Sequence, residues 1–118
     1  MRNVFLFFFI CWCWATTAYA RHKCPEREYV SQYCPGSTEV ILPDRTRIDC
    51  LTDEYAIEFD FASKWAEAVG QSLHYAYMTG RVAAIYLILE SDKDMHFVDV
   101  LTPLCDAYEI KLFLIKNY

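Results

Sequence analysis

The stretch RIDCLTDEYAIEFDFASKWAEAVGQSLHY, Arg47 to Tyr75, gathers acidic residues, a lysine and a Gln/Tyr pair in one short span of the chain. Two β-rich runs within it, Arg47 to Thr52 and Tyr55 to Phe61, flank the polar pair Asp53-Glu54. This pattern predicts a β-hairpin with a two-residue loop. We expect the rest of the chain to support this hairpin and the helix that follows it.

The register of this hairpin sets two carboxylates opposite each other. Counting outward from the loop pairs Leu51 with Ala56, Cys50 with Ile57, Asp49 with Glu58 and Arg47 with Asp60. Facing carboxylates repel, so a cation or a shared proton usually offsets the repulsion. A hard divalent metal is the obvious candidate. The alternative is a solvated face on which Arg47 and Asp60 form an ion pair worth under about 1 kcal/mol.

A helix is expected from about Ala62 to Thr79, with Gly80 in the C′ position that ends it. At about 100° per residue, Lys64, Gln71 and Tyr75 fall within roughly 40° of one another on one side. A separate apolar stripe would hold the helix on the sheet, formed by Trp65, Val69, Leu73 and Ala76. The polar side of the helix therefore faces the acidic pair or the solvent.

The first twenty residues read as a targeting segment. Met1 to Ala20 has one early positive charge, an apolar run from Val4 to Trp14 and the ending Ala18-Tyr19-Ala20, which predicts a secretory signal peptide. The apolar run is shorter than the ~20 residues of a spanning helix, so no stable membrane anchor is expected. We expect residues 21–118 to form a single secreted or periplasmic domain.

The net charge of −5 argues against a tight, non-specific nucleic-acid binder. Neutralisation of phosphates by Lys and Arg supplies most of the affinity of non-specific nucleic-acid binders, and an acidic chain lacks it. A phosphate contact bridged by a metal ion remains compatible with this charge.

Four cysteines remain after the predicted signal peptide, and an exported chain favours disulfides over zinc ligation. If Pro25 to Tyr33 forms a helix, Cys24 and Cys34 lie about 15 Å apart at its two ends, too far to bond. A loop in its place would allow that pair. We favour Cys34 with Cys50, because a helix packed under the sheet brings them together. Cys24 with Cys105 follows by elimination, unless Cys105 is a free buried thiol.

The remaining segments complete the predicted order of elements. Thr38 to Leu42 reads as a strand turned back by Pro43 to Thr46, which makes Asp44 a turn residue. Glu39, on that strand, is either solvated or reaches the acidic face. The unbroken apolar run VAAIYLIL, Val82 to Leu89, indicates a central parallel strand, and a helix and a last strand follow. The order is helix, three strands, helix, strand, helix, strand, an α/β or α+β three-layer sandwich around a mixed sheet.

These residues and this order resemble the PD-(D/E)xK nuclease superfamily, in particular its exonuclease-like branch with a Gln-x-x-x-Tyr helix. The resemblance implies a restriction-endonuclease-like fold in which Asp49 and Glu58 bind Mg²⁺ or Mn²⁺. Gln71 and Tyr75 match Gln-x-x-x-Tyr. Asp60 stands where the family usually has a lysine, and members are known whose lysine has moved to the following helix, where Lys64 lies here.

Two functions follow from this resemblance. In the first, the chain is an exported nuclease that hydrolyses phosphodiester bonds of nucleic acid. The metal would orient and acidify a water, Lys64 would stabilise developing negative charge, and Asp60 could be a third ligand. In the second, the chain is a non-catalytic secreted binding module that keeps the nuclease fold.

Overall fold

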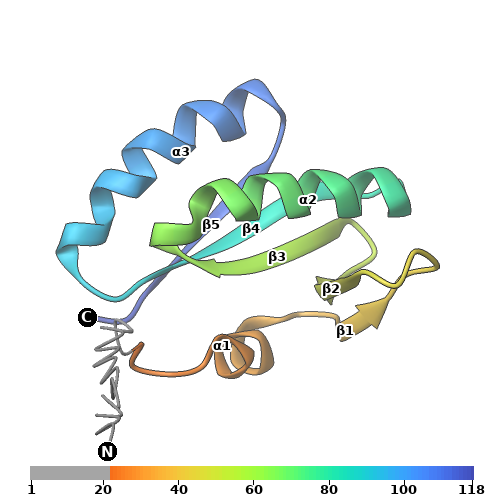
Figure 1. The fold of residues 1–118 in the computed structure, drawn as a ribbon, viewed down its shortest axis with the longest axis horizontal. Helices are drawn as coiled ribbons and strands as arrows, with labels where there is room; N and C mark the ends of the chain where they lie inside the picture. The colour runs from red at the N-terminus through yellow and green to blue at the C-terminus, as the bar shows by residue number, and fades with distance from the viewer. Residues whose placement is uncertain (1–21) are drawn as a thin grey trace, which may run out of the picture.

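The computed structural model describes residues 22–118, so the predicted signal peptide, Met1 to Ala20, lies outside the described residues. The fold is α+β, with one five-stranded mixed sheet and three α-helices (Figure 1). Along the chain the elements are α1 (Glu26–Tyr33), β1 (Ser37–Ile41), β2 (Arg47–Leu51), β3 (Tyr55–Phe61), α2 (Trp65–Thr79), β4 (Val82–Leu89), α3 (Met95–Ala107) and β5 (Lys111–Lys116). No helix in this part of the chain is long and apolar enough to cross a membrane.

The sheet has an antiparallel half and a parallel half. Its strands lie in the order β1-β2-β3-β4-β5; β1, β2 and β3 pair antiparallel, whereas β3, β4 and β5 pair parallel. Parallel neighbours need long crossover connections, and α2 and α3 supply them. Figure 1 shows α2 and α3 on one face of the sheet and α1 on the other, which makes three layers.

Two hydrophobic clusters lie on the two faces of the sheet. Alternate residues of β4 point into each: Ile85, Leu87 and Leu89 pack under α2 and α3, while Ala84 and Ile88 pack under α1. Only Val82 and Tyr86 of this strand are not buried. The apolar run therefore forms the central parallel strand that its composition predicts.

The β2–β3 hairpin has the predicted register near its loop and departs from it farther out. Cys50 pairs with Ile57 and Leu51 with Ala56, as expected. The predicted pairings of Asp49 with Glu58 and of Arg47 with Asp60 are both wrong, because the ladder between these strands consists of the two pairs Cys50 with Ile57 and Leu51 with Ala56. Arg47 turns instead to the neighbouring strand β1, where its Nε lies 2.6 Å from Glu39 Oε2. Glu39 is thus an exposed edge-strand residue, and its charge still raises the pKa of Asp49.

Helix α2 ends as predicted, but its beginning and its apolar stripe differ from expectation. Gly80 has a left-handed φ of 69° and donates its N–H to Ala76 O at 2.8 Å. Residues 62–64 form a short 3₁₀ turn, so the helix itself begins at Trp65. Trp65, Val69 and Ala76 of the predicted stripe pack against the core, as expected. Leu73 is 36% exposed, whereas Tyr75 from the polar side is buried, so the packed face of the helix includes Tyr75 in place of Leu73.

One predicted disulfide is present and the other is not. Cys34, at the end of α1, is bonded to Cys50 of β2, with their Cα atoms 5.7 Å apart. The predicted pair of Cys24 with Cys105 is wrong, because both are free thiols. Cys24 packs with the cluster on the α1 face and Cys105 lies in the cluster under α2 and α3. The sheet separates them, and Cys105 is the free buried thiol of the alternative reading.

Candidate functional site

Three carboxylates are buried where β2 and β3 separate. Asp49 is 7% exposed, Glu58 is 5% exposed and Asp60 is 3% exposed. Ionised carboxylates are rarely buried without a partner, because desolvation of the charge is costly. Their burial therefore calls for hydrogen bonds, protons or a cation.

Backbone hydrogen bonds account for part of this requirement. Asp49 Oδ2 accepts the N–H of Phe59 at 2.9 Å, and Asp60 Oδ1 accepts the N–H of Phe61 at 2.9 Å. Glu58 has no backbone hydrogen bond of this kind. It shares a side-chain hydrogen bond with Asp49, while its Oε2 is buried and has no hydrogen-bond partner among the described residues. A buried polar atom without a partner in a folded protein needs an explanation, such as a missing ion.

A fourth carboxyl group, which the sequence interpretation missed, comes from the other side of the sheet. Glu26 of α1 is half-buried, and its pKa is raised to about 7, first by burial and then by the negative charges of Asp49 and Asp60. The charge of Lys64 opposes this rise. In the sequence Glu26 reads only as an acidic residue in the first turn of a helix, where it is favourable for the helix dipole. The approach of α1 to β2 and β3 is what makes it part of the site.

The acidic residues raise one another's pKa values. Burial raises the pKa of Glu58 to about 10, and the charges of Asp49, Glu26 and Asp60 add to the effect. Burial raises the pKa of Asp60 to about 6, against the N–H of Phe61 and the charge of Lys64. Burial likewise raises the pKa of Asp49, against its hydrogen bond from Phe59. Glu58 accordingly holds a proton at neutral pH unless a cation replaces it.

Of the three residues predicted on the helix, two lie within electrostatic range of the acidic residues. Lys64 is exposed in the turn before α2, and its charge lowers the pKa of both Asp60 and Glu26. Tyr75 is 5% exposed, and its pKa is raised to about 12 by burial and by the charges of Glu58 and Asp49. Gln71 is exposed, and within residues 22–118 no hydrogen bond joins it to the carboxylates.

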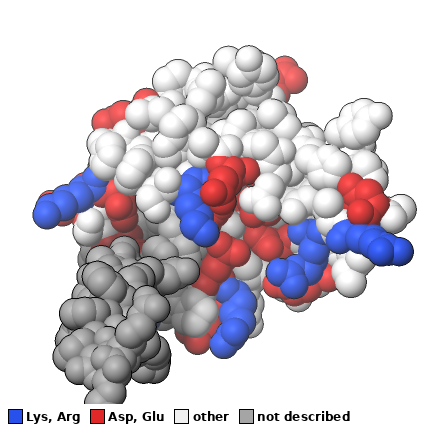
Figure 2. Space-filling view, in the orientation of Figure 1, with Lys and Arg blue, Asp and Glu red and all other residues white. Residues whose placement is uncertain are grey.

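Figure 2 shows acidic and basic side chains side by side in the middle of one face of the molecule. Lys64 is exposed and Glu26 is half-buried, so the site reaches the surface although Asp49, Glu58 and Asp60 are mostly covered. Asp44 is not part of it. As predicted, it is a turn residue that accepts hydrogen bonds from Thr46, and it also contacts His74 Nε2 at 2.7 Å.

The donors present suit a hard cation held by few protein ligands. Among the described residues, no group of three or more His, Cys, Asp or Glu side chains is arranged to hold a metal ion. Mg²⁺ commonly binds through one or two carboxylates and completes its coordination with water and substrate phosphates. The Asp49 and Glu58 pair, with the unpartnered Glu58 Oε2, fits that mode and not a closed structural metal site.

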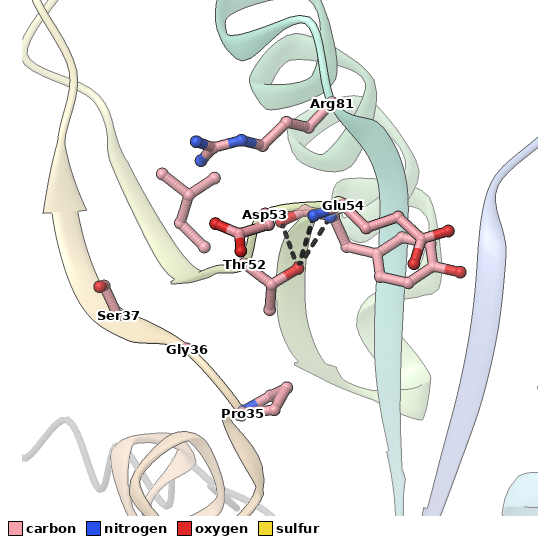
Figure 3. Close-up of a pocket in the computed structure, with 9 residues that line it drawn as sticks. Pro35, Gly36, Ser37, Thr52, Asp53, Glu54 and Arg81 are labelled. Carbon is pink, nitrogen blue, oxygen red and sulfur yellow. Dashed lines mark hydrogen bonds between the residues drawn. The ribbon is translucent and has the colours of Figure 1, made fainter.

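A cavity of about 550 Å³ lies at the opposite end of β3, next to the hairpin loop. Figure 3 shows Arg81 and Asp53 across it from Ser37 and Gly36. Thr52 Oγ1 accepts the N–H of Tyr55 at 2.8 Å and shapes the loop beneath. Because Asp60 lies at the other end of the strand, this cavity is separate from the acidic site.

No protein-family model, curated protein or solved structure matches this chain. The resemblance to the PD-(D/E)xK nucleases therefore rests on the sequence pattern alone.

Proposed function

We propose that this chain is a metal-dependent phosphodiester hydrolase of the PD-(D/E)xK type that acts on nucleic acid outside the cytoplasm. The observation that carries the proposal is the buried Oε2 of Glu58, which has no partner among the described residues and lies beside the carboxyl groups of Asp49, Glu26 and Asp60. A divalent cation would satisfy this oxygen and replace the proton that Glu58 otherwise holds. Mg²⁺ and Mn²⁺ are the cations whose ligand preferences fit.

Asp49 and Glu58 would hold the cation. When bound, the cation would polarise a phosphoryl oxygen and lower the pKa of a water. Lys64 would stabilise negative charge that develops on the phosphate, since its ammonium group lies within electrostatic range of Asp60. Asp60, at the position of the usual lysine, would add negative charge beside the cation. Tyr75 is buried within range of the charges of both carboxyl groups, and Gln71 is free to contact substrate from the exposed side of α2.

We also propose that the protein is exported after cleavage of the signal peptide near Ala20. The Cys34–Cys50 disulfide supports this proposal, because disulfides persist in oxidising compartments.

The second candidate is a non-catalytic secreted module that keeps the nuclease fold and binds a protein or a metal. The observation that favours it is the buried Asp60 at the usual lysine position, with the nearest candidate lysine exposed in a turn. Stabilisation by Mn²⁺ is expected of both candidates, so only turnover separates them.

The test is hydrolysis of single- and double-stranded DNA and RNA by the purified protein in millimolar Mn²⁺. Cleavage that EDTA and Glu58→Gln both abolish, while Asp99→Asn leaves it intact, would support the nuclease. Asp99 is the matched control because it is exposed on α3, away from the acidic residues. If Mn²⁺ raises the melting temperature and no substrate is cut, the non-catalytic module is the better account.

A further inference from the structure

We propose that the disulfide bond between Cys34 and Cys50 positions the candidate cation site, so that its carboxylates converge only in the oxidised protein. This inference rests on the cation site proposed above and adds its dependence on redox state. The structural reason is that two of the four carboxyl groups are on elements that are weakly attached to the sheet.

Glu58 and Asp60 form the firmly held half of the site. Both are on β3, which pairs with β4 along its whole length, from Tyr55 opposite Val82 to Phe61 opposite Ile88. Their backbone positions are therefore fixed by the parallel core of the sheet.

Asp49 belongs to the weakly held half. Its strand β2 is joined to β3 by a ladder of two residue pairs, which ends at Cys50 opposite Ile57. Next to that last pair, the Asp49 carboxylate itself accepts the N–H of Phe59. Strand β1 is at the edge of the sheet and pairs with β2. The β1–β2 hairpin thus depends on a short ladder for its place beside β3.

Glu26 belongs to the same half, because its helix is short. Helix α1 has eight residues, which is below the length at which an isolated helix is stable in water. Tyr29 and Val30 bury against the sheet, and Cys34 at the end of the helix is bonded to Cys50, the neighbour of Asp49. One covalent bond therefore ties the helix that carries Glu26 to the strand that carries Asp49.

The disulfide is the restraint on this weakly held half. It holds Cys34, at the end of α1, against Cys50 of β2. Reduction removes that restraint, so α1 and β2 can separate from β3 and carry Glu26 and Asp49 away from Glu58 and Asp60.

The first experiment compares Mn²⁺ affinity in the oxidised protein and in the double variant Cys34→Ser/Cys50→Ser by isothermal titration calorimetry. Loss of a group that orients metal ligands commonly weakens metal binding by about 10- to 100-fold, and we expect a loss in that range. The matched control is Cys24→Ser, which removes a free thiol from the same face and should bind Mn²⁺ as the parent does.

The second experiment needs no cysteine variant and remains decisive if the double variant does not fold. Two glutathione thiols reduce the bond: the S–S bond breaks, Cys34 and Cys50 become thiols, and one glutathione disulfide forms. Mn²⁺ binding and disulfide reduction are coupled, and such coupling is reciprocal. Saturating Mn²⁺ should therefore raise the ratio of squared glutathione to glutathione disulfide at half-reduction by the same factor, about 10- to 100-fold. In Glu58→Gln, Mn²⁺ should produce no shift.

Equal Mn²⁺ affinity with and without the disulfide would overturn the positioning role, and so would a redox midpoint that Mn²⁺ leaves unchanged in the parent. Either result would leave the cation site itself intact. If the oxidised parent binds no Mn²⁺ at millimolar concentration, the cation site and its dependence on the disulfide both fail.

Discussion

Glu58 combines nearly complete burial with an unpartnered oxygen, so its protonation state should control the stability of the metal-free protein. Its pKa rises from an ordinary 4.5 to about 10 in the folded protein, so the folded state binds a proton that the unfolded state has released. Such a group contributes its full stabilisation at a pH below its pKa in the unfolded state. That contribution is lost as the pH rises towards its pKa in the folded state.

We therefore predict that the metal-free protein loses stability from about pH 4.5 to pH 8 and that Glu58→Gln loses less. The amide resembles the protonated acid, so the two proteins should be similar at pH 4.5. A shift of one pKa unit corresponds to about 1.4 kcal/mol. At pH 8 we therefore expect the free energy of unfolding of the variant to exceed that of the parent by at least about 1 kcal/mol. Urea unfolding in EDTA across this range measures the difference, with Asp99→Asn following the parent. Parallel curves for parent and Glu58→Gln would contradict the raised pKa.

Gly36 illustrates a second constraint at the scale of single residues. A Cβ atom on this glycine would lie 2.2 Å from the carbonyl oxygen of Leu51, whereas a Cβ on Gly70 would meet nothing within 4 Å. We expect Gly36→Ala to lower the free energy of unfolding by about 3 kcal/mol, because overpacked sites force the backbone to move. Gly70→Ala, in the middle of α2, should raise it by about 0.5–1 kcal/mol. Thermal unfolding of the two variants side by side would show shifts of opposite sign.

At the scale of elements, the turn between β3 and α2 carries Lys64, the residue proposed to stabilise developing negative charge. Lys64 lies there, exposed, and acts on the acidic residues through its charge without forming an ion pair within the described part of the chain. Its position depends on the turn at residues 62–64, which separates the strand from the helix.

Lys64→Ala should therefore keep Mn²⁺ affinity and lose cleavage. Removal of one donor that stabilises transition-state charge typically lowers kcat by about 10²- to 10³-fold, and we expect a loss of that size. Lys93→Ala is the matched control, since Lys93 is an exposed lysine in the turn before α3. Cleavage assays and Mn²⁺ titrations on both variants provide the comparison, and parental turnover in Lys64→Ala would remove this residue from the mechanism.

Local spacing predicted the elements because strand alternation and helix caps depend on neighbouring residues. The apolar run of β4, the Gly80 end of α2 and the pairing of Cys50 with Ile57 all follow from such patterns. The pairings of Asp49 with Glu58 and of Arg47 with Asp60 failed because a register counted from the loop assumes a continuous ladder. Here the ladder stops after two pairs, and Asp49 takes a backbone N–H with its side chain.

The site was predicted in part for the same reason. Asp49, Glu58 and Asp60 are on the two strands of one hairpin, so they lie within electrostatic range of one another even though the predicted pairing of Asp49 with Glu58 is absent. Glu26 reaches them only through the packing of α1 on the sheet, which no local pattern encodes. Leu73 is the opposite case. Its helical spacing predicted that it packs on the sheet, but it is 36% exposed.

At the scale of the whole molecule, the sheet has two faces, and residues 22–118 place one free thiol on each of them. Cys24 is partly accessible beside α1, whereas Cys105 is 2% exposed under α2 and α3. In the folded protein, maleimide should modify Cys24 quickly and Cys105 only after addition of denaturant. Peptide mapping without reductant should recover Cys34 joined to Cys50. Recovery of Cys24 joined to Cys34 would contradict both the pairing and the helix between them.

The two halves of the sheet also differ in how many neighbours each strand has. Strand β4 is paired along its length with β3 on one side and β5 on the other, whereas β1 is an edge strand attached through β2. Amide hydrogens exchange with solvent deuterium as their part of the structure opens, and strands paired on both sides open last. In deuterated buffer, the amides of β4 should persist longest and those of β1 should vanish first. Early exchange would then spread along β2 towards Asp49, so the proposed cation site would lie at the border between the part of the sheet that opens first and the part that opens last.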